Sequence, residues 1–254
     1  MRSQRSRDMA LGVALAVAML AAPAWAEALK PPAAPPQPGD VVQAMSKFLA
    51  AQKGFSYHGE LEFDQLMPGG PKVRLAGAVD VSVARPGSLF VDYRDDVSAR
   101  VVWLQNGQLT LLDPVAGTFA EISGPKDIDG MVAKLEKEYG VSLPLGELAE
   151  SDPHAALTRG VDQAHYLGVR DVDGFACHHV LLQRPDLDLQ LWIEVGAKPL
   201  LRKVVFEYPE RPGQPEYEVT ITEWTLAAPK PGIFAPKLPK GAGRVGFLPI
   251  GEAR

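Results

Sequence analysis

Cys177, His178 and His179 follow one another in the sequence, and they are residue types that bind zinc or act as nucleophile and base. The alternation of polar and apolar residues around them predicts a β-strand, in which neighbouring side chains point to opposite faces. Only Cys177 and His179 would then share a face, about 6.5 Å apart along the strand. That separation is too long for the direct hydrogen bond that activates a nucleophile.

A zinc site needs three or four converging ligands, and the sequence has no second group of histidines and cysteines. The acidic pairs Asp95–Asp96 and Asp186/Asp188 fall at expected turns, and no twelve-residue calcium loop surrounds them. We therefore expect no metal, no cofactor and no catalytic residues, so the chain is not predicted to be an enzyme. The formal net charge of −5 argues against nucleic acid as a partner.

The N-terminus has the features of a secretory signal peptide. Three arginines precede an apolar run from Met9 to Ala22, and Ala24-Trp25-Ala26 is a small-x-small cleavage site. We expect cleavage after Ala26 and a periplasmic location. The alternative is a membrane anchor, but the run is shorter than the roughly 20 apolar residues that span a bilayer. Residues 27–39 contain five prolines and are expected to form a linker.

Two long blocks of the remaining chain, residues 55–122 and 161–226, alternate apolar and polar side chains between turn residues. This pattern predicts consecutive antiparallel strands. Helical periods precede and separate the blocks, at residues 40–54, 127–139 and 144–150, and residues 151–160 are expected to be loop. The predicted fold is mainly β with a few helices, a large curled antiparallel sheet of about 11 strands over residues 40–240, followed by an irregular tail at 241–254.

The helices are the only candidates to cover the apolar face of such a sheet. Trp192 and Trp224 alternate with charged neighbours, so we expect both to point outward. Trp103 is expected to point inward. The expected inward set, which would line a ligand cavity, is Leu61, Phe63, Val79, Val91, Tyr93, Trp103, Leu109, Leu111, Val204 and Phe206.

Four segments carry a resemblance to a known family. They are the helix leading into Phe55 and Leu61-Glu62-Phe63; residues 83–90 (Val-Ala-Arg-Pro-Gly-Ser-Leu-Phe); residues 103–114, with Asn106-Gly107 and Asp113-Pro114; and residues 234–239 (Phe-Ala-Pro-Lys-Leu-Pro). Their order over residues 40–239 resembles the LolA/LolB-like superfamily of periplasmic lipoprotein carriers. Residues 174–179, 191–193 and 199–203 are more similar to a branch of uncharacterised predicted periplasmic proteins, a domain-of-unknown-function family.

The resemblance implies an unclosed β-barrel wrapped around lid helices, with a cavity that takes acyl chains. It also implies that Arg85 holds the lid helices shut, since its fork of donors suits backbone carbonyls. A solvated turn arginine is the alternative, and both stay open. Met131 and Leu135 are expected to occupy the cavity when it is empty. The chain lacks the lipid-attachment cysteine of the anchored receptor type.

We therefore predict a monomeric, non-catalytic periplasmic carrier that holds a lipid or the acyl chains of a lipoprotein. Its expected partner is a lipid or acylated protein, and a membrane-bound partner protein is a further candidate. The first alternative is a sensor or regulator of the same fold that acts through protein–protein contacts. The second is a structural domain whose core leaves no room for a ligand.

Overall fold

The computed structural model describes residues 34–247, apart from 142 and 144. The predicted signal peptide and most of the predicted linker lie outside these residues. Helix α1 (Pro38–Ala50) begins two residues before the expected start at Asp40, with a proline in its first turn. Its buried stripe includes Val42, Met45 and Leu49, which face the sheet. Within the described residues, no helix combines the length and apolar character needed to cross a membrane.

All twelve strands of the described chain belong to one sheet, with the order β12-β6-β5-β4-β3-β2-β1-β11-β10-β9-β8-β7. Their bounds are β1 Gly54–Leu66, β2 Lys72–Ala84, β3 Ser88–Asp95, β4 Ala99–Gln105, β5 Gln108–Asp113, β6 Thr118–Ser123, β7 Gln163–Val172, β8 Phe175–Gln183, β9 Asp188–Glu194, β10 Leu201–Glu207, β11 Glu216–Thr225 and β12 Gly243–Arg244. The sheet does not close, because β12 and β7 are its two edges. The predicted mainly β fold with a large open sheet is confirmed.

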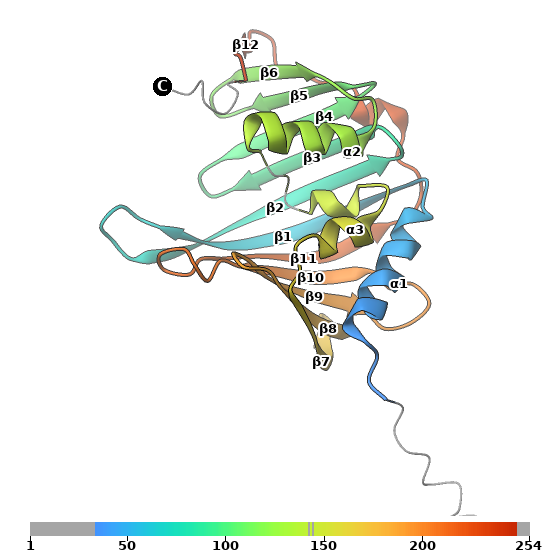
Figure 1. Cartoon of the computed structure of the whole chain (residues 1–254). Coiled ribbons are helices and arrows are strands. Elements are labelled where there is room, and N and C mark those ends of the chain that lie inside the picture. The colour runs from blue at the N-terminus through green and yellow to red at the C-terminus, as the bar shows by residue number, and fades with distance from the viewer. Residues whose placement is uncertain (1–33, 142, 144, 248–254) are drawn as a thin grey trace, which may run out of the picture. The chain divides into compact units, whose positions relative to one another are not determined.

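The two strand blocks join at the centre of the sheet, where β1 pairs with β11. Neighbouring strands are antiparallel except for β12, which runs parallel to β6 at Gly243 and Arg244, inside the tail expected to be irregular. Helices α1, α2 (Ile128–Lys134) and α3 (Pro153–Thr158) lie on the same face of the sheet (Figure 1). That face carries the main apolar core.

The connection between the two strand blocks is helical for most of its length. Asp127 begins α2, and its Oδ1 accepts a hydrogen bond from the Gly130 backbone N–H at 2.7 Å. A π-helical turn, η1 (Leu135–Tyr139), continues α2 and ends at Gly140, which has a positive φ of 64°. A short 3-10 helix, η2 (Gly146–Leu148), follows. The expected loop at 151–160 is wrong, since it contains α3, with Asp152 as its N-cap.

Trp103 does not point into the main core, so the expected inward orientation is wrong. Both faces of β4 are apolar: Val102 and Leu104 enter the main core, whereas Trp103 joins a separate cluster on the opposite face. Its neighbours there are Val101, Leu112, Phe90 and Phe119. The 3-10 helix η3 (Pro231–Phe234) packs beside β3 and β4 on that side. Alternation alone could not decide which apolar face of β4 is inward.

Trp224 also differs from its expected outward orientation. A bulge interrupts the pairing of β1 with β11 between His58 and Gly59, and it reverses the alternation along β11. The Trp224 ring therefore packs against Phe55 and Tyr57, at centroid distances of 5.6 and 5.1 Å. Its Nε1 donates to the Leu201 carbonyl oxygen at 2.9 Å. The alternation within one strand segment cannot reveal a bulge of this kind.

Trp192 does face outward, as expected, on the side of β9 opposite the buried Leu191 and Ile193. Its ring stacks on His179 at 4.0 Å between centroids. His178 lies on the other face and its Nδ1 is 2.9 Å from the Tyr166 hydroxyl. Cys177 is buried, and burial raises the pKa of its thiol to about 11. Within the described residues, no group of three or more metal-binding side chains converges.

Candidate ligand-binding cavity

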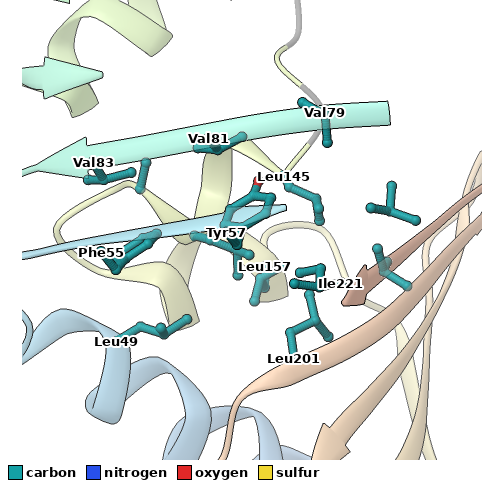
Figure 2. Packing of buried hydrophobic residues seen from close by; sticks show 14 of the residues in the cluster. Leu49, Phe55, Tyr57, Val79, Val81, Val83, Leu145, Leu157, Leu201 and Ile221 are labelled. Carbon is teal, nitrogen blue, oxygen red and sulfur yellow. The ribbon is translucent and has the colours of Figure 1, made fainter. Parts of the chain in front are cut away.

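An apolar cavity of about 340 Å³ lies between the central strands and the segment that connects the two strand blocks. The wall of strands comes from β1 to β5 and β11, and the opposite wall comes from Val141, Leu143 and Leu145. Figure 2 shows Tyr57 of β1 beside Leu145 of the connecting segment, below Val79 and Val81 of β2. The volume falls within the range of about 300–1,000 Å³ that is usual for small-molecule sites.

Four residues of the expected lining do line this cavity: Val79, Val91, Tyr93 and Leu111. Leu61, Leu109, Val204 and Phe206 are buried in the main core but do not contribute to the cavity wall. Phe63 is half-buried and packs against Tyr217 at 5.9 Å between ring centroids. Trp103 lies on the other face of the sheet, as described above.

Other lining residues were not expected from the sequence. Val102 lies on the face of β4 opposite Trp103, and Tyr57, Tyr217 and Val219 come from the paired central strands β1 and β11. Val141, Leu143, Leu145 and Arg100 complete the lining. The signal for the connecting segment was present, since leucines recur at 143, 145 and 148. Only the fold shows that Leu143 and Leu145 line this cavity, whereas Leu148 packs in the main core.

The polar groups of this cavity are few and are held by neighbours. Tyr93 donates its hydroxyl to Asp95 Oδ2 at 2.6 Å, and Arg100 Nη1 lies 2.9 Å from Asp113 Oδ2. Burial raises the pKa of the tyrosine hydroxyls of Tyr57, Tyr93 and Tyr217, so all three stay protonated near neutral pH. Among the described lining residues, the cavity offers apolar contact and hydroxyl groups, without a nucleophile paired to a base.

Arg85 makes the contacts that a latch would need. It lies in the turn between β2 and β3, and its Nη1 donates to the carbonyl oxygens of Ala149 and Glu150 at 2.5 and 2.6 Å. Its Nη2 donates to the Leu148 carbonyl oxygen at 3.0 Å. These carbonyls lie at the end of η2, where no further helical turn satisfies them. Burial lowers the pKa of Arg85 from its ordinary value.

The same turn also contacts the start of α2. The Pro86 carbonyl oxygen accepts a hydrogen bond from the Ile128 backbone N–H at 2.9 Å. Gly87 approaches the chain so closely that a Cβ at this position would lie 2.0 Å from the Lys126 carbonyl oxygen. Residues 85–87 therefore bind both the beginning and the end of the α2–η2 region. Met131 and Leu135 of that region are buried in the main core and do not line the cavity.

Comparison with known proteins agrees with this architecture. The model of a family described as predicted periplasmic protein (DUF2092) matches residues 39–248. No match is found among curated proteins. A solved structure of an uncharacterized conserved protein from Thermus thermophilus has a TM-score of 0.50 at 9% identity, covering 82% of this chain and 97% of that chain. At this identity the likeness concerns the fold alone.

Two further solved structures are similar at lower TM-scores. The lipoprotein LppX from Mycobacterium tuberculosis has a TM-score of 0.44 at 12% identity, covering 74% of this chain and 94% of that chain. A LolA superfamily protein from Nitrosomonas europaea has a TM-score of 0.38 at 10% identity, covering 80% and 99%. The expected place in a branch of uncharacterised periplasmic proteins is confirmed by the family match: this chain belongs to the family of predicted periplasmic proteins DUF2092.

Proposed function

We propose that this protein is a non-catalytic periplasmic carrier that holds a lipid, or the acyl chains of a lipoprotein, in the cavity between the central strands and the connecting segment. The observation that carries the proposal is the cavity itself, which has about 340 Å³ of space and aliphatic side chains on both walls. An acyl chain that enters it would gain about 0.8 kcal/mol for each CH₂ group removed from water. The family description supports the periplasmic location.

Binding fits the lining better than catalysis does. The polar side chains among its described residues are three tyrosines and Arg100, and the raised pKa of each tyrosine leaves none of them able to act as a base near neutral pH. Arg100 is occupied by Asp113 at 2.9 Å. A ligand held here would therefore be bound and released unchanged.

Entry of a ligand would require residues 145–150 to move away from the strands. The three hydrogen bonds from Arg85 to this region supply a fixed closed position. Leu145 of this region faces the cavity, so opening would expose the cavity and this side chain together. In this scheme Arg85 sets the free-energy cost of opening, and the ligand offsets that cost.

The experiment is organic extraction of the protein after export of the full-length chain to the periplasm of a bacterial host. Mass spectrometry of the extract should find lipid at a fixed stoichiometry. A Val91→Trp variant, which fills the cavity, should carry less lipid, whereas Val97→Trp should match the wild type because Val97 is 62% exposed and outside the cavity. Equal amounts of lipid on wild type and Val91→Trp would refute binding at this site.

A regulator that acts through protein contacts is the second candidate, and the outward face of β8–β10 favours it. Trp192 is half-buried there between the stacked His179 ring and Lys203, whose Nζ is 5.4 Å from the indole centroid. Aromatic side chains on the surface are common anchors of protein interfaces. Loss of a partner in affinity purification of Trp192→Ala, with no loss in Val91→Trp, would favour this function over the carrier.

A further inference from the structure

A second cavity of about 390 Å³ adjoins the apolar cavity. Leu143 and Tyr217 line both cavities, so these two side chains form the boundary between the adjacent spaces. The second cavity lies between the connecting segment and the turns that end β8 and β10. The first cavity has one charged side chain in its lining, Arg100, whereas the second has seven, which are Glu136, Glu147, Glu150, Arg159, Arg184, Asp186 and Arg211.

Two of these side chains have buried polar atoms without a partner among the described residues. Glu147 Oε2 and Arg184 Nε each lack a hydrogen bond, although Arg184 Nη2 donates to the Leu157 carbonyl oxygen at 2.8 Å. Buried polar atoms are almost always paired in native proteins, since an unpaired one costs free energy. Both side chains line the second cavity and hold an unmet acceptor and an unmet donor, so each has hydrogen-bonding capacity left for a bound group once the side chain turns toward it.

The other charges of the second cavity are only loosely paired. The Arg159 guanidinium lies 3.9 Å from Glu136 and 3.7 Å from Glu150, which is longer than a hydrogen bond. The Arg211 guanidinium lies over the Tyr208 ring, 4.1 Å from its centroid. Burial raises the pKa of Glu147 and of Glu150, and this effect outweighs the lowering effect of Arg184 and Arg159 on Glu147 and of Arg159 on Glu150.

The combination of charges restricts what such a ligand can be. Guanidinium groups bind phosphate through charge-assisted hydrogen bonds, and carboxylates bind ammonium groups. A fatty acid would satisfy only the arginines, and a simple cation would satisfy only the carboxyl groups. A headgroup that carries both charges, placed next to an apolar chain, matches the two adjoining cavities.

We propose that the second cavity is a headgroup subsite for an amphiphile whose headgroup contains both a phosphate and an ammonium group. The phosphate faces Arg184 and the ammonium group faces Glu147, while the acyl chain lies in the apolar cavity. This assignment rests on the proposed carrier function, and it adds the class of lipid that the carrier selects.

The test compares ligands that share one acyl chain and differ only in the headgroup. A fluorescent fatty-acid probe is displaced from the exported protein by lysophosphatidylethanolamine or by the neutral monoacylglycerol. The wild type should respond to the lysophospholipid at a concentration about tenfold lower, equivalent to about 1.4 kcal/mol. Arg184→Met and Glu147→Gln should each remove most of this advantage and leave monoacylglycerol displacement unchanged. Arg94→Met is the matched control, because Arg94 lies outside both cavities.

Three outcomes would overturn the proposal. In the first, lysophosphatidylethanolamine and monoacylglycerol displace the probe equally well from the wild type. In the second, Arg184→Met and Glu147→Gln keep the full advantage of lysophosphatidylethanolamine over monoacylglycerol. In the third, free phosphoethanolamine binds as tightly as the lysophospholipid, which would identify a soluble zwitterion as the ligand. Failure of the carrier function is distinguishable, because then neither the probe nor the monoacylglycerol would bind. Circular dichroism and the melting temperature of each variant show whether it is folded, and two independent variants keep the test decisive.

Discussion

Arg85 Nη1 lies 2.5 Å from the carbonyl oxygen of Ala149, although 64 residues separate the two in the sequence. The contact joins the turn between β2 and β3, in the first strand block, to the end of η2 in the connecting segment. Two further carbonyls, those of Leu148 and Glu150, accept from the same guanidinium. One side chain therefore determines where residues 148–150 lie relative to the strands.

Removal of this guanidinium should loosen residues 145–151. Hydrogen bonds from a charged donor contribute about 1.5–3 kcal/mol each, and Arg85→Met removes three of them. Amide hydrogen exchange in 145–151 should accelerate about tenfold or more, since about 1.4 kcal/mol corresponds to a factor of ten. Exchange in α1 should stay as in the wild type. Unchanged exchange at 145–151 would mean that Arg85 is only a turn residue, the alternative that the sequence left open.

The close approach of Gly87 to the start of α2 gives a second prediction. A Cβ at Gly87 would lie 2.0 Å from the Lys126 carbonyl oxygen, so the backbone must shift in Gly87→Ala. We expect a loss of about 1–3 kcal/mol in the free energy of unfolding, as for other overpacked positions. Denaturant unfolding measures it.

Gly39→Ala is the control for that substitution. Gly39 lies in the first turn of α1 and has nothing within 4 Å of an added Cβ. Alanine favours a helix over glycine, so this variant should be neutral or slightly more stable. Equal destabilisation by the two substitutions would contradict the docking of the 85–87 turn on α2.

The buried carboxyl group of Glu147 predicts how stability depends on pH. Burial raises its pKa above the ordinary value of 4.5, so the folded protein binds this proton more tightly than the unfolded chain does. The resulting stabilisation is complete below about pH 4.5 and is lost as the pH rises through the raised pKa. Glu147→Gln cannot lose a proton, so its stability should fall less between pH 4.5 and neutral pH.

The measurement is the difference in unfolding free energy between wild type and Glu147→Gln as a function of pH. Titrating groups remote from Glu147 are present in both proteins and cancel in this difference, whereas Glu150 adds to it because the charge of Glu147 raises its pKa. Asp64 has a lowered pKa, because hydrogen bonds from Lys72 and Arg74 outweigh its burial. Its contribution to the pH dependence of stability therefore falls below the pH range tested. A constant difference from about pH 4.5 to neutral pH would contradict the raised pKa of Glu147.

The sequence was sufficient for the strands, because turn residues separate clear alternating segments from Phe55 to Thr225. It was insufficient for side-chain orientations that depend on tertiary contacts. β4 is apolar on both faces, so Trp103 could be placed only when η3 was seen to cover the second face. The bulge at His58–Gly59, which turns Trp224 inward, has no local signature. Helix α3 does have one, in Asp152 followed by Pro153, but its six residues are too few to show a helical period.

Alternation identified inward-facing positions such as Val79 and Val91. It could not distinguish residues that line the cavity from residues that are packed in the core. Leu109 and Val204 face the same side of the sheet, yet they are fully packed. The distinction depends on where the connecting segment crosses the sheet, which is a property of the whole chain. The assignment of Arg85 came from family resemblance, since an arginine before a proline is otherwise an ordinary turn residue.

The proposed carrier function requires that a lipid binds in the apolar cavity. Titration of the exported, delipidated protein with a fluorescent fatty-acid probe should give saturable binding at one site. Val91→Trp should weaken that binding about tenfold or more, about 1.4 kcal/mol, while Val97→Trp should bind as the wild type does. Absence of saturable binding to the wild type, or equal binding to wild type and Val91→Trp, would contradict the proposed function.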